Sequence, residues 1–132
     1  MKNKKIKAFS LNELLVVMVI IGILAAIAVP KFNEMTAGAY SAETGVWLNA
    51  IELKQGVYHK KNFNYSMSFQ DIKFTPPKQK PEGTSVYNYE MVEATNTTFI
   101  CKATAVNDYD GDGIKEEITI DQEGVIRTTV ED

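Results

Sequence analysis

The sequence is poor in the residues that build disulfide-linked or catalytic sites. Its 132 residues include one cysteine, Cys101, and one histidine, His59. A single cysteine excludes an intrachain disulfide, and its alternation with Phe99 and Ala103 predicts a buried apolar thiol. We find no nucleophile–base pair, no recognisable pair of catalytic acids and no phosphate-binding glycine loop. The composition therefore argues against an enzyme.

Basic residues become scarce once the first eight residues are set aside. The whole chain has 14 basic and 17 acidic residues and a net charge of −3. Four of the basic residues are lysines of the leader 1–8, and without them the net charge is −7. An acidic body makes nucleic acid an unlikely partner. The best basic run, Lys73, Lys78 and Lys80, is interpreted as a solvated face, with a DNA-binding strip as the alternative.

A long apolar run follows the leader. About 16 residues from Leu14 to Val29 carry no charge, which is typical of a membrane-spanning helix. The lysines in front of it predict a cytoplasmic N-terminus. A secretory signal has its small-residue cleavage site behind the apolar run, whereas here the comparable junction, Ala8 before Phe9, precedes it. Cleavage at this junction would leave the apolar helix on the mature protein.

Residues 7–32 resemble the class III signal of type IV pilins and of the pseudopilins of type II secretion. The resemblance implies that a prepilin peptidase cleaves after Ala8 and that the new N-terminal amine of Phe9 is methylated. It also implies that Glu13, the fifth residue after cleavage, acts in assembly. Gly22 and Pro30 match the glycine and the first proline of the family's helix, whereas Ala8 and Asn12 depart from the usual glycine and large apolar residue.

The resemblance implies a structural subunit of a type IV pilus that polymerises through its N-terminal helix into a helical homopolymer. Before assembly it would span the inner membrane once and meet an inner-membrane assembly platform, and afterwards it would lie in an extracellular pilus. One alternative is the major pseudopilin of a type II secretion system. Another is a minor adhesive or DNA-binding pilin.

Glu13 supports this interpretation on physical grounds. An acidic residue at the centre of a membrane helix costs about 2.5–3.5 kcal/mol on insertion scales, and Glu13, close to one end, pays less if it reaches the interface. An acidic residue within a membrane helix is functional by default, and the alternative is a solvated carboxylate at a helix end. The natural partner of Glu13 is a positive charge. The resemblance implies that this partner is the Phe9 amine of a neighbouring subunit.

The pattern becomes amphipathic beyond Pro30, where we expect a kink or a locally melted turn because proline lacks an N–H. A helix from about Leu11 to about His59 would be roughly 70–75 Å long. We therefore divide the chain into a leader (1–8), a membrane and filament-core half of the helix (9–30), and a globular head (31–132). Spacings of three and four predict one buried stripe in the head's part of the helix. Its predicted members are Val46, Trp47, Ala50, Ile51, Leu53, Val57 and Tyr58.

A sheet is predicted after an irregular connection, residues 60–84, which aromatic residues should hold against the head. These anchors are Tyr58, Phe63, Tyr65, Phe69 and Phe74. Within 85–132, period-two alternation predicts strands at Ser85–Val92, Thr97–Val106, Ile114–Asp121 and Val125–Val130. Short connections favour an antiparallel meander. The predicted fold class is α+β, a long helix packed against a roughly four-stranded antiparallel sheet.

A run of alternate aspartates lies between the second and third predicted strands. Asp108, Asp110 and Asp112, the carbonyl of Ile114 and the carboxylate of Glu116 follow the spacing of the first half of an EF-hand loop. Hard oxygen ligands suit Ca²⁺, so the sequence predicts a calcium site. The alternative is an acidic turn, since turns favour aspartate and glycine.

Overall fold

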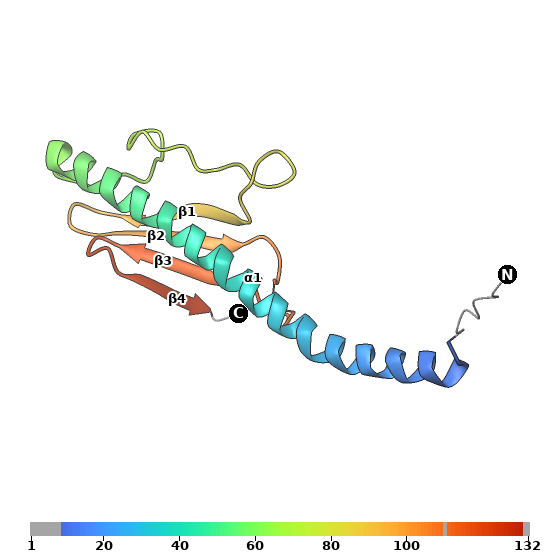
Figure 1. Cartoon of the computed structure of the whole chain (residues 1–132). Helices are drawn as coiled ribbons and strands as arrows, with labels where there is room; N and C mark the ends of the chain where they lie inside the picture. Colours follow the sequence, from blue (N-terminus) through green and yellow to red (C-terminus); the bar gives the residue numbers. More distant parts are fainter. Residues whose placement is uncertain (1–8, 110, 131–132) are drawn as a thin grey trace. The chain divides into compact units, whose positions relative to one another are not determined.

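The computed structural model describes residues 9–109 and 111–130. One helix, α1 (Leu11–Asn62), precedes four strands (Figure 1). The strands are β1 (Tyr87–Ala94), β2 (Phe99–Ala105), β3 (Glu117–Asp121) and β4 (Ile126–Val130). Contacts divide the chain into two units, residues 1–32 and residues 33–132, and the second unit is the head. The predicted α+β fold class is confirmed.

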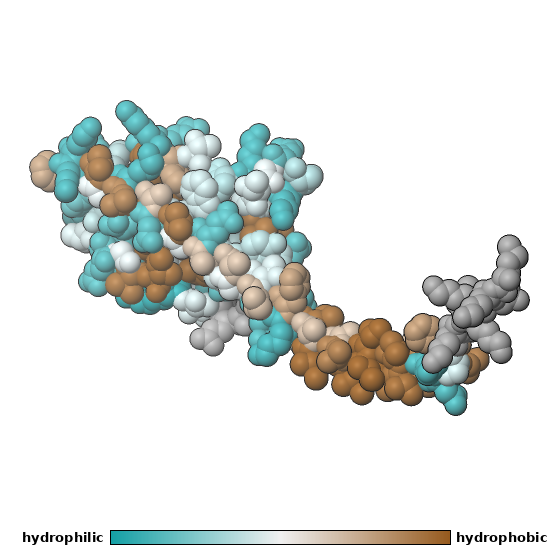
Figure 2. All heavy atoms as spheres, viewed as in Figure 1, coloured by the Kyte–Doolittle hydropathy of each residue, from teal (hydrophilic) through white to brown (hydrophobic). Residues whose placement is uncertain are grey.

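The first unit holds the apolar half of α1. The most apolar 18-residue window of this helix has a mean hydropathy of 2.7, and none of that window is buried. Figure 2 shows the corresponding stretch as nearly continuous hydrophobic side chains. By length and composition the helix can cross a membrane. The chain stays helical through Pro30, so the locally melted turn expected there is absent.

The four strands form the predicted antiparallel meander, in the order β1-β2-β3-β4. The pairing shifts register between Met91 and Glu93 and again between Glu117 and Ile118. The third strand begins at Glu117 and not at Ile114. The difference arises because the aspartate-rich turn continues through residues 111–115, which are all exposed.

One face of the sheet forms the core with the head's part of α1. Along β2, Phe99, Cys101, Ala103 and Ala105 are buried and alternate with partly exposed residues, as the two-residue period of a strand requires. The other core residues of this cluster include Leu48, Ile51, Tyr87, Tyr89, Ile118 and Ile120. The prediction for Cys101 is confirmed, and burial raises the pKa of its thiol to about 12.

The predicted helix stripe is wrong for three of its seven residues. Val46, Leu53 and Val57 are 66%, 67% and 57% exposed. The fully buried positions are Thr44, Leu48, Ile51 and Gln55, with Trp47, Ala50 and Tyr58 packed beside them. Successive residues are about 100° apart around a helix, so the predicted list combined residues from opposite sides. Two of the buried positions are polar, so a prediction based on hydrophobic residues alone could not identify the buried face of the helix.

A buried polar pair ties the connection 60–84 to the helix. The Gln55 side chain donates to the Ser66 carbonyl at 2.6 Å and accepts from the Ser66 amide at 3.0 Å. Phe74 is buried, and Tyr58, Tyr65 and Phe69 pack against the core. Phe63 is 80% exposed and is therefore not an anchor. The connection is held at both its start and its middle.

Two neighbouring helix positions test the two faces of α1. We expect Ile51→Ala to lower the free energy of unfolding by about 2–5 kcal/mol, because it opens a cavity in the core. Leu53→Ala removes an exposed side chain and should change that free energy by no more than about 0.5 kcal/mol. Denaturant unfolding of the full chain in detergent measures both. Equal losses would contradict the assignment of the faces.

Candidate assembly and processing site

The start of α1 is held by a reciprocal pair of hydrogen bonds. The Ser10 amide donates to Glu13 Oε2 at 2.8 Å, and the Glu13 amide donates to Ser10 Oγ at 3.2 Å. This is a capping box, in which the residue before the helix and the third helical residue satisfy each other's backbone donors. The pattern Ser-x-x-Glu at the head of an apolar run is visible in the sequence. It therefore gives Glu13 a local structural role that the sequence analysis missed.

Capping alone does not account for a carboxylate in front of an apolar helix. A negative charge at a helix N-terminus gains about 0.3–1 kcal/mol from the helix dipole. Moving an acidic residue towards the centre of a bilayer costs about 2.5–3.5 kcal/mol. Glu13 lies in the first turn of α1 and pays less than this where it reaches the interface, but full burial in the bilayer would cost more than the helix dipole returns. Glu13 would thus need a cation as well as its cap once its surroundings become apolar.

The residues around Glu13 are exposed and mostly apolar. Phe9 is 84% exposed. Leu11, Leu14, Leu15 and Met18 line a shallow apolar hollow of about 190 Å³ on the first turns of α1. Ala8, which precedes the predicted cleavage, lies outside the described residues. The described part of this end of the chain therefore offers an apolar surface with one carboxylate beside it.

The aspartate-rich turn is organised by its own backbone. Asp108 accepts hydrogen bonds from the amides of Gly111, at 2.6 Å, and Gly113, at 2.8 Å. Asp112 accepts from the Ile114 amide at 2.7 Å. Gly113 has a φ of 91°, a conformation that favours glycine. Asp110 lies outside the described residues.

Glu116 points into the head. Its side chain is buried, and its Oε2 accepts hydrogen bonds from Ser41 Oγ, at 2.5 Å, and from the Tyr87 hydroxyl. It thereby connects the end of the aspartate-rich turn to α1 and to the start of β1.

Within residues 9–109 and 111–130, no three His, Cys, Asp or Glu side chains lie close enough to hold a metal ion. Asp108, Asp112 and Glu116 are the predicted ligands whose side chains this statement covers, and the prediction for the complete set, with Asp110 and the Ile114 carbonyl, stays a prediction.

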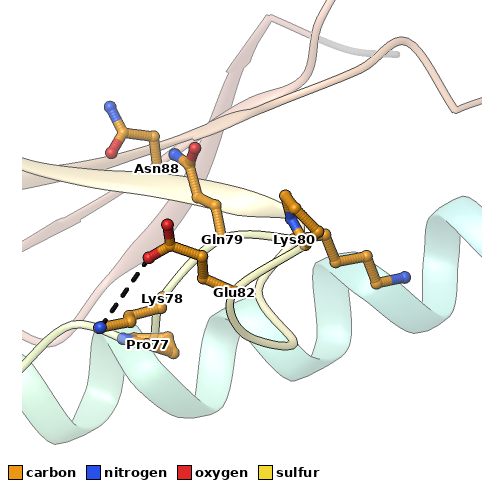
Figure 3. A pocket seen from close by; sticks show the side chains of 7 residues that line it. Pro77, Lys78, Gln79, Lys80, Glu82 and Asn88 are labelled. Atoms are coloured by element: carbon orange, nitrogen blue, oxygen red, sulfur yellow. Dashed lines mark ion pairs between the residues drawn. The ribbon is translucent and has the colours of Figure 1, made fainter.

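The predicted basic run is divided between two hollows. Lys78 and Lys80 line one of about 540 Å³ with Gln79, Glu82 and Asn88 (Figure 3). Lys78 Nζ lies 3.9 Å from Glu82 Oε2 there, and Lys80 Nζ lies 5.8 Å from the centre of the Tyr40 ring. Lys73 lines a separate hollow of about 420 Å³ beside the C-terminal turns of α1. The three lysines therefore do not converge on one groove.

The fold and the site define an α+β protein with an exposed, apolar N-terminal helix and a capped glutamate at its start. Residues 3–29 match the model of the prokaryotic N-terminal methylation motif. The chain is 34% identical over 84 residues to the type IV major pilin protein PilA of Myxococcus xanthus, an alignment that covers 64% of this chain and 38% of PilA. It is 33% identical over 104 residues to the type IV narrow pilus major component PilA5 of Thermus thermophilus, covering 75% of this chain and 81% of PilA5.

The chain belongs to the type IV pilin family. By family it is a structural subunit of a pilus and not an enzyme, as the sequence predicts. It spans less than half the length of the Myxococcus relative and most of the Thermus relative.

Proposed function

We propose that a prepilin peptidase cleaves this chain between Ala8 and Phe9, that the amine of Phe9 is methylated, and that the subunit polymerises through α1 into a helical pilus. The observation that carries the proposal is the apolar half of α1, whose most apolar window has no buried residue. Such a helix requires a membrane or other apolar helices around it. Glu13 at its start supplies one charge that a neighbour's Phe9 amine can pair with.

The same helix supports a proposal of two successive locations for the subunit. Before assembly its apolar half spans the inner membrane, with the lysine leader on the cytoplasmic side. An inner-membrane assembly platform then transfers it into an extracellular filament. The head remains outside the hydrocarbon throughout, because its exposed sheet face carries charges such as the Glu90–Lys102–Glu117 cluster.

The names of the relatives favour a main pilus subunit over a secretion pseudopilin and over a minor pilin. Both are described as major components of type IV pili, whereas a pseudopilin would form a periplasmic piston. A DNA-binding minor pilin would need a continuous basic strip, and the lysines described above lie in two separate hollows. We therefore propose that this chain is one of the main filament subunits.

The charge of Glu13 can be separated from its capping role. Glu13→Gln keeps the capping box, because glutamine also serves at the third helical position, but it removes the charge. We expect it to lower the filament yield about tenfold or more, since a tenfold change needs only about 1.4 kcal/mol per association step. Immunoblots and electron microscopy of sheared surface fractions measure the yield.

Ser10→Ala is the matched control for Glu13→Gln. It weakens the cap by about 1 kcal/mol and keeps the carboxylate, so most filaments should remain. A normal filament yield from Glu13→Gln would contradict the charge-pairing role. Loss of filaments with Ser10→Ala but not with Glu13→Gln would mean that Glu13 acts only through the cap.

We also propose that the aspartate-rich turn binds Ca²⁺ through Asp108, Asp110, Asp112 and the Ile114 carbonyl. The alternation of the three aspartates supports this, as does the sharp turn at Gly113. Glu116 is left out of the set because its carboxylate is buried and points into the head, towards Ser41 and Tyr87.

Thermal unfolding in calcium and in chelator tests the calcium proposal. The wild-type chain should melt at a higher temperature in calcium, and Asp110→Ala combined with Asp112→Ala should abolish that difference. Glu116→Ala is the control: it should lose about 1–3 kcal/mol of stability in both conditions, because it removes the acceptor of the Ser41 hydroxyl and of the buried Tyr87 hydroxyl, and should keep the calcium-dependent difference. Equal melting temperatures of the wild type in calcium and chelator would overturn the proposal.

A further inference from the structure

The end of α1 carries a bulky aromatic residue in a backbone conformation that favours glycine. Phe63 directly follows the last helical residue, and its amide donates to the His59 carbonyl at 2.8 Å. Its φ is 58°, which is the left-handed conformation that ends many helices and that glycine or asparagine usually occupies. A bulky residue there is an outlier. Asn62 and Asn64 lie on either side, so a better suited residue is one position away in the sequence.

The strain at Phe63 is not compensated by burial of its ring. The side chain is 80% exposed, and that of Met67, four residues further on, is 54% exposed. Strained residues of this kind cluster at binding and switch sites. Phe63 costs the fold strain and still leaves its ring in water. It therefore indicates a partner outside its own chain.

The surroundings of Phe63 are basic, although the protein is acidic. Residues 54–73 hold four lysines and one aspartate, a net charge of +3, whereas the chain without its leader carries −7. Two of these lysines, Lys60 and Lys61, are exposed in the last turn of α1. Lys61 also lines the hollow of about 420 Å³ together with Lys54 and Lys73. We call the following set the basic pole: Lys54, Lys60, Lys61, Phe63, Met67 and Lys73.

The basic pole is fixed to one end of the head. The ring of His59 stacks on that of Tyr65 with centroids 4.3 Å apart, and His59 Nε2 lies 2.8 Å from the Asn96 carbonyl oxygen. The Tyr65 amide donates to the Thr95 carbonyl at 2.8 Å. The C-terminal end of α1 therefore lies at the same end of the head as the turn between β1 and β2 (Figure 1). A packed scaffold thus presents the pole.

We infer that the basic pole binds a lipid surface with anionic headgroups, and that Phe63 and Met67 enter the boundary between the headgroups and the acyl chains. Lysines next to such a surface are attracted by its negative potential. Aromatic rings prefer the level of the headgroups, and exposed apolar side chains add buried area there. The rest of the head stays in water. Binding of this kind needs the head alone and does not require a filament.

Proteins and nucleic acids fit the basic pole less well than lipid does. Protein interfaces are depleted in lysine, whereas four of the six residues of the pole are lysines. Single-stranded nucleic acid is bound in a basic groove with aromatic platforms for successive bases, and the pole offers the ring of Phe63 beside the aliphatic Met67. Lysines around an exposed aromatic residue are instead typical of proteins that lie on a membrane surface.

Tethering of two vesicle populations tests the inference with the full chain. The chain is reconstituted through α1 into vesicles of neutral phosphatidylcholine and mixed, without calcium, with labelled vesicles that also contain anionic phosphatidylglycerol. We expect the labelled vesicles to co-sediment with the protein, and salt to weaken this binding because it screens charge. Lys60→Gln combined with Lys61→Gln should lower the apparent affinity about tenfold or more.

Phe63→Asn separates binding by the ring from a role in the fold. Asparagine tolerates the left-handed conformation, so this variant should melt at the same or a higher temperature and yet bind anionic vesicles about tenfold or more weakly. Phe63→Trp keeps an aromatic ring for the interface and should retain binding. Lys78→Gln combined with Lys115→Gln removes as much charge from exposed positions outside the pole and should leave binding unchanged.

Loss of either contribution would overturn the inference. Equal binding of neutral and anionic labelled vesicles would exclude recognition of anionic headgroups. Unchanged binding by Phe63→Asn would leave attraction by the lysines alone, and a lower melting temperature of this variant would make the ring a structural residue. Displacement of the vesicles by a single-stranded oligonucleotide that Phe63→Asn no longer binds would assign the pole to nucleic acid. Absence of processing or of filaments in cells would overturn the proposed function and leave the vesicle result intact.

Discussion

The structure depends on an apolar helix that the rest of its own chain does not cover. About 16 consecutive residues from Leu14 to Val29 are uncharged, and the most apolar window of α1 has no buried residue. Each buried Leu, Ile or Val side chain gains about 1.5–3 kcal/mol over an exposed one. A helix that leaves so many of them exposed is stable only in a bilayer or against other copies. The family, the leader and the capped glutamate are all consistent with a subunit that moves from one of these environments to the other.

The head buries only one side of its part of α1. The sheet buries Leu48 and Ile51 and leaves Val46, Leu53 and Val57 exposed. Polar groups then connect the remaining segments to the helix. Gln55 holds the connection 60–84 through Ser66, and Glu116 holds the end of the aspartate-rich turn through Ser41. One side of the helix therefore builds the head, and the opposite side remains exposed.

The sequence predicts those features that depend on residues close together in the chain. The long helix, the four-stranded meander and the burial of Cys101 are all confirmed, because hydrophobic period and turn residues determine them locally. The faces of the helix were assigned wrongly because Thr44 and Gln55 are buried through partners that no local pattern reveals. The inward direction of Glu116 likewise depends on Ser41 and Tyr87, which are distant in sequence. The Ser10–Glu13 capping box is local, and the four-residue pattern would have predicted it.

Mass spectrometry of the subunit in a sheared cell-surface fraction tests the central claim most directly. The account predicts filaments whose subunit begins at Phe9 and carries one methyl group on its N-terminal amine. A subunit that keeps its lysine leader would contradict both the cleavage site and the role assigned to the apolar helix. A processed subunit found only in the inner membrane and periplasm would contradict the extracellular pilus and favour a secretion pseudopilin.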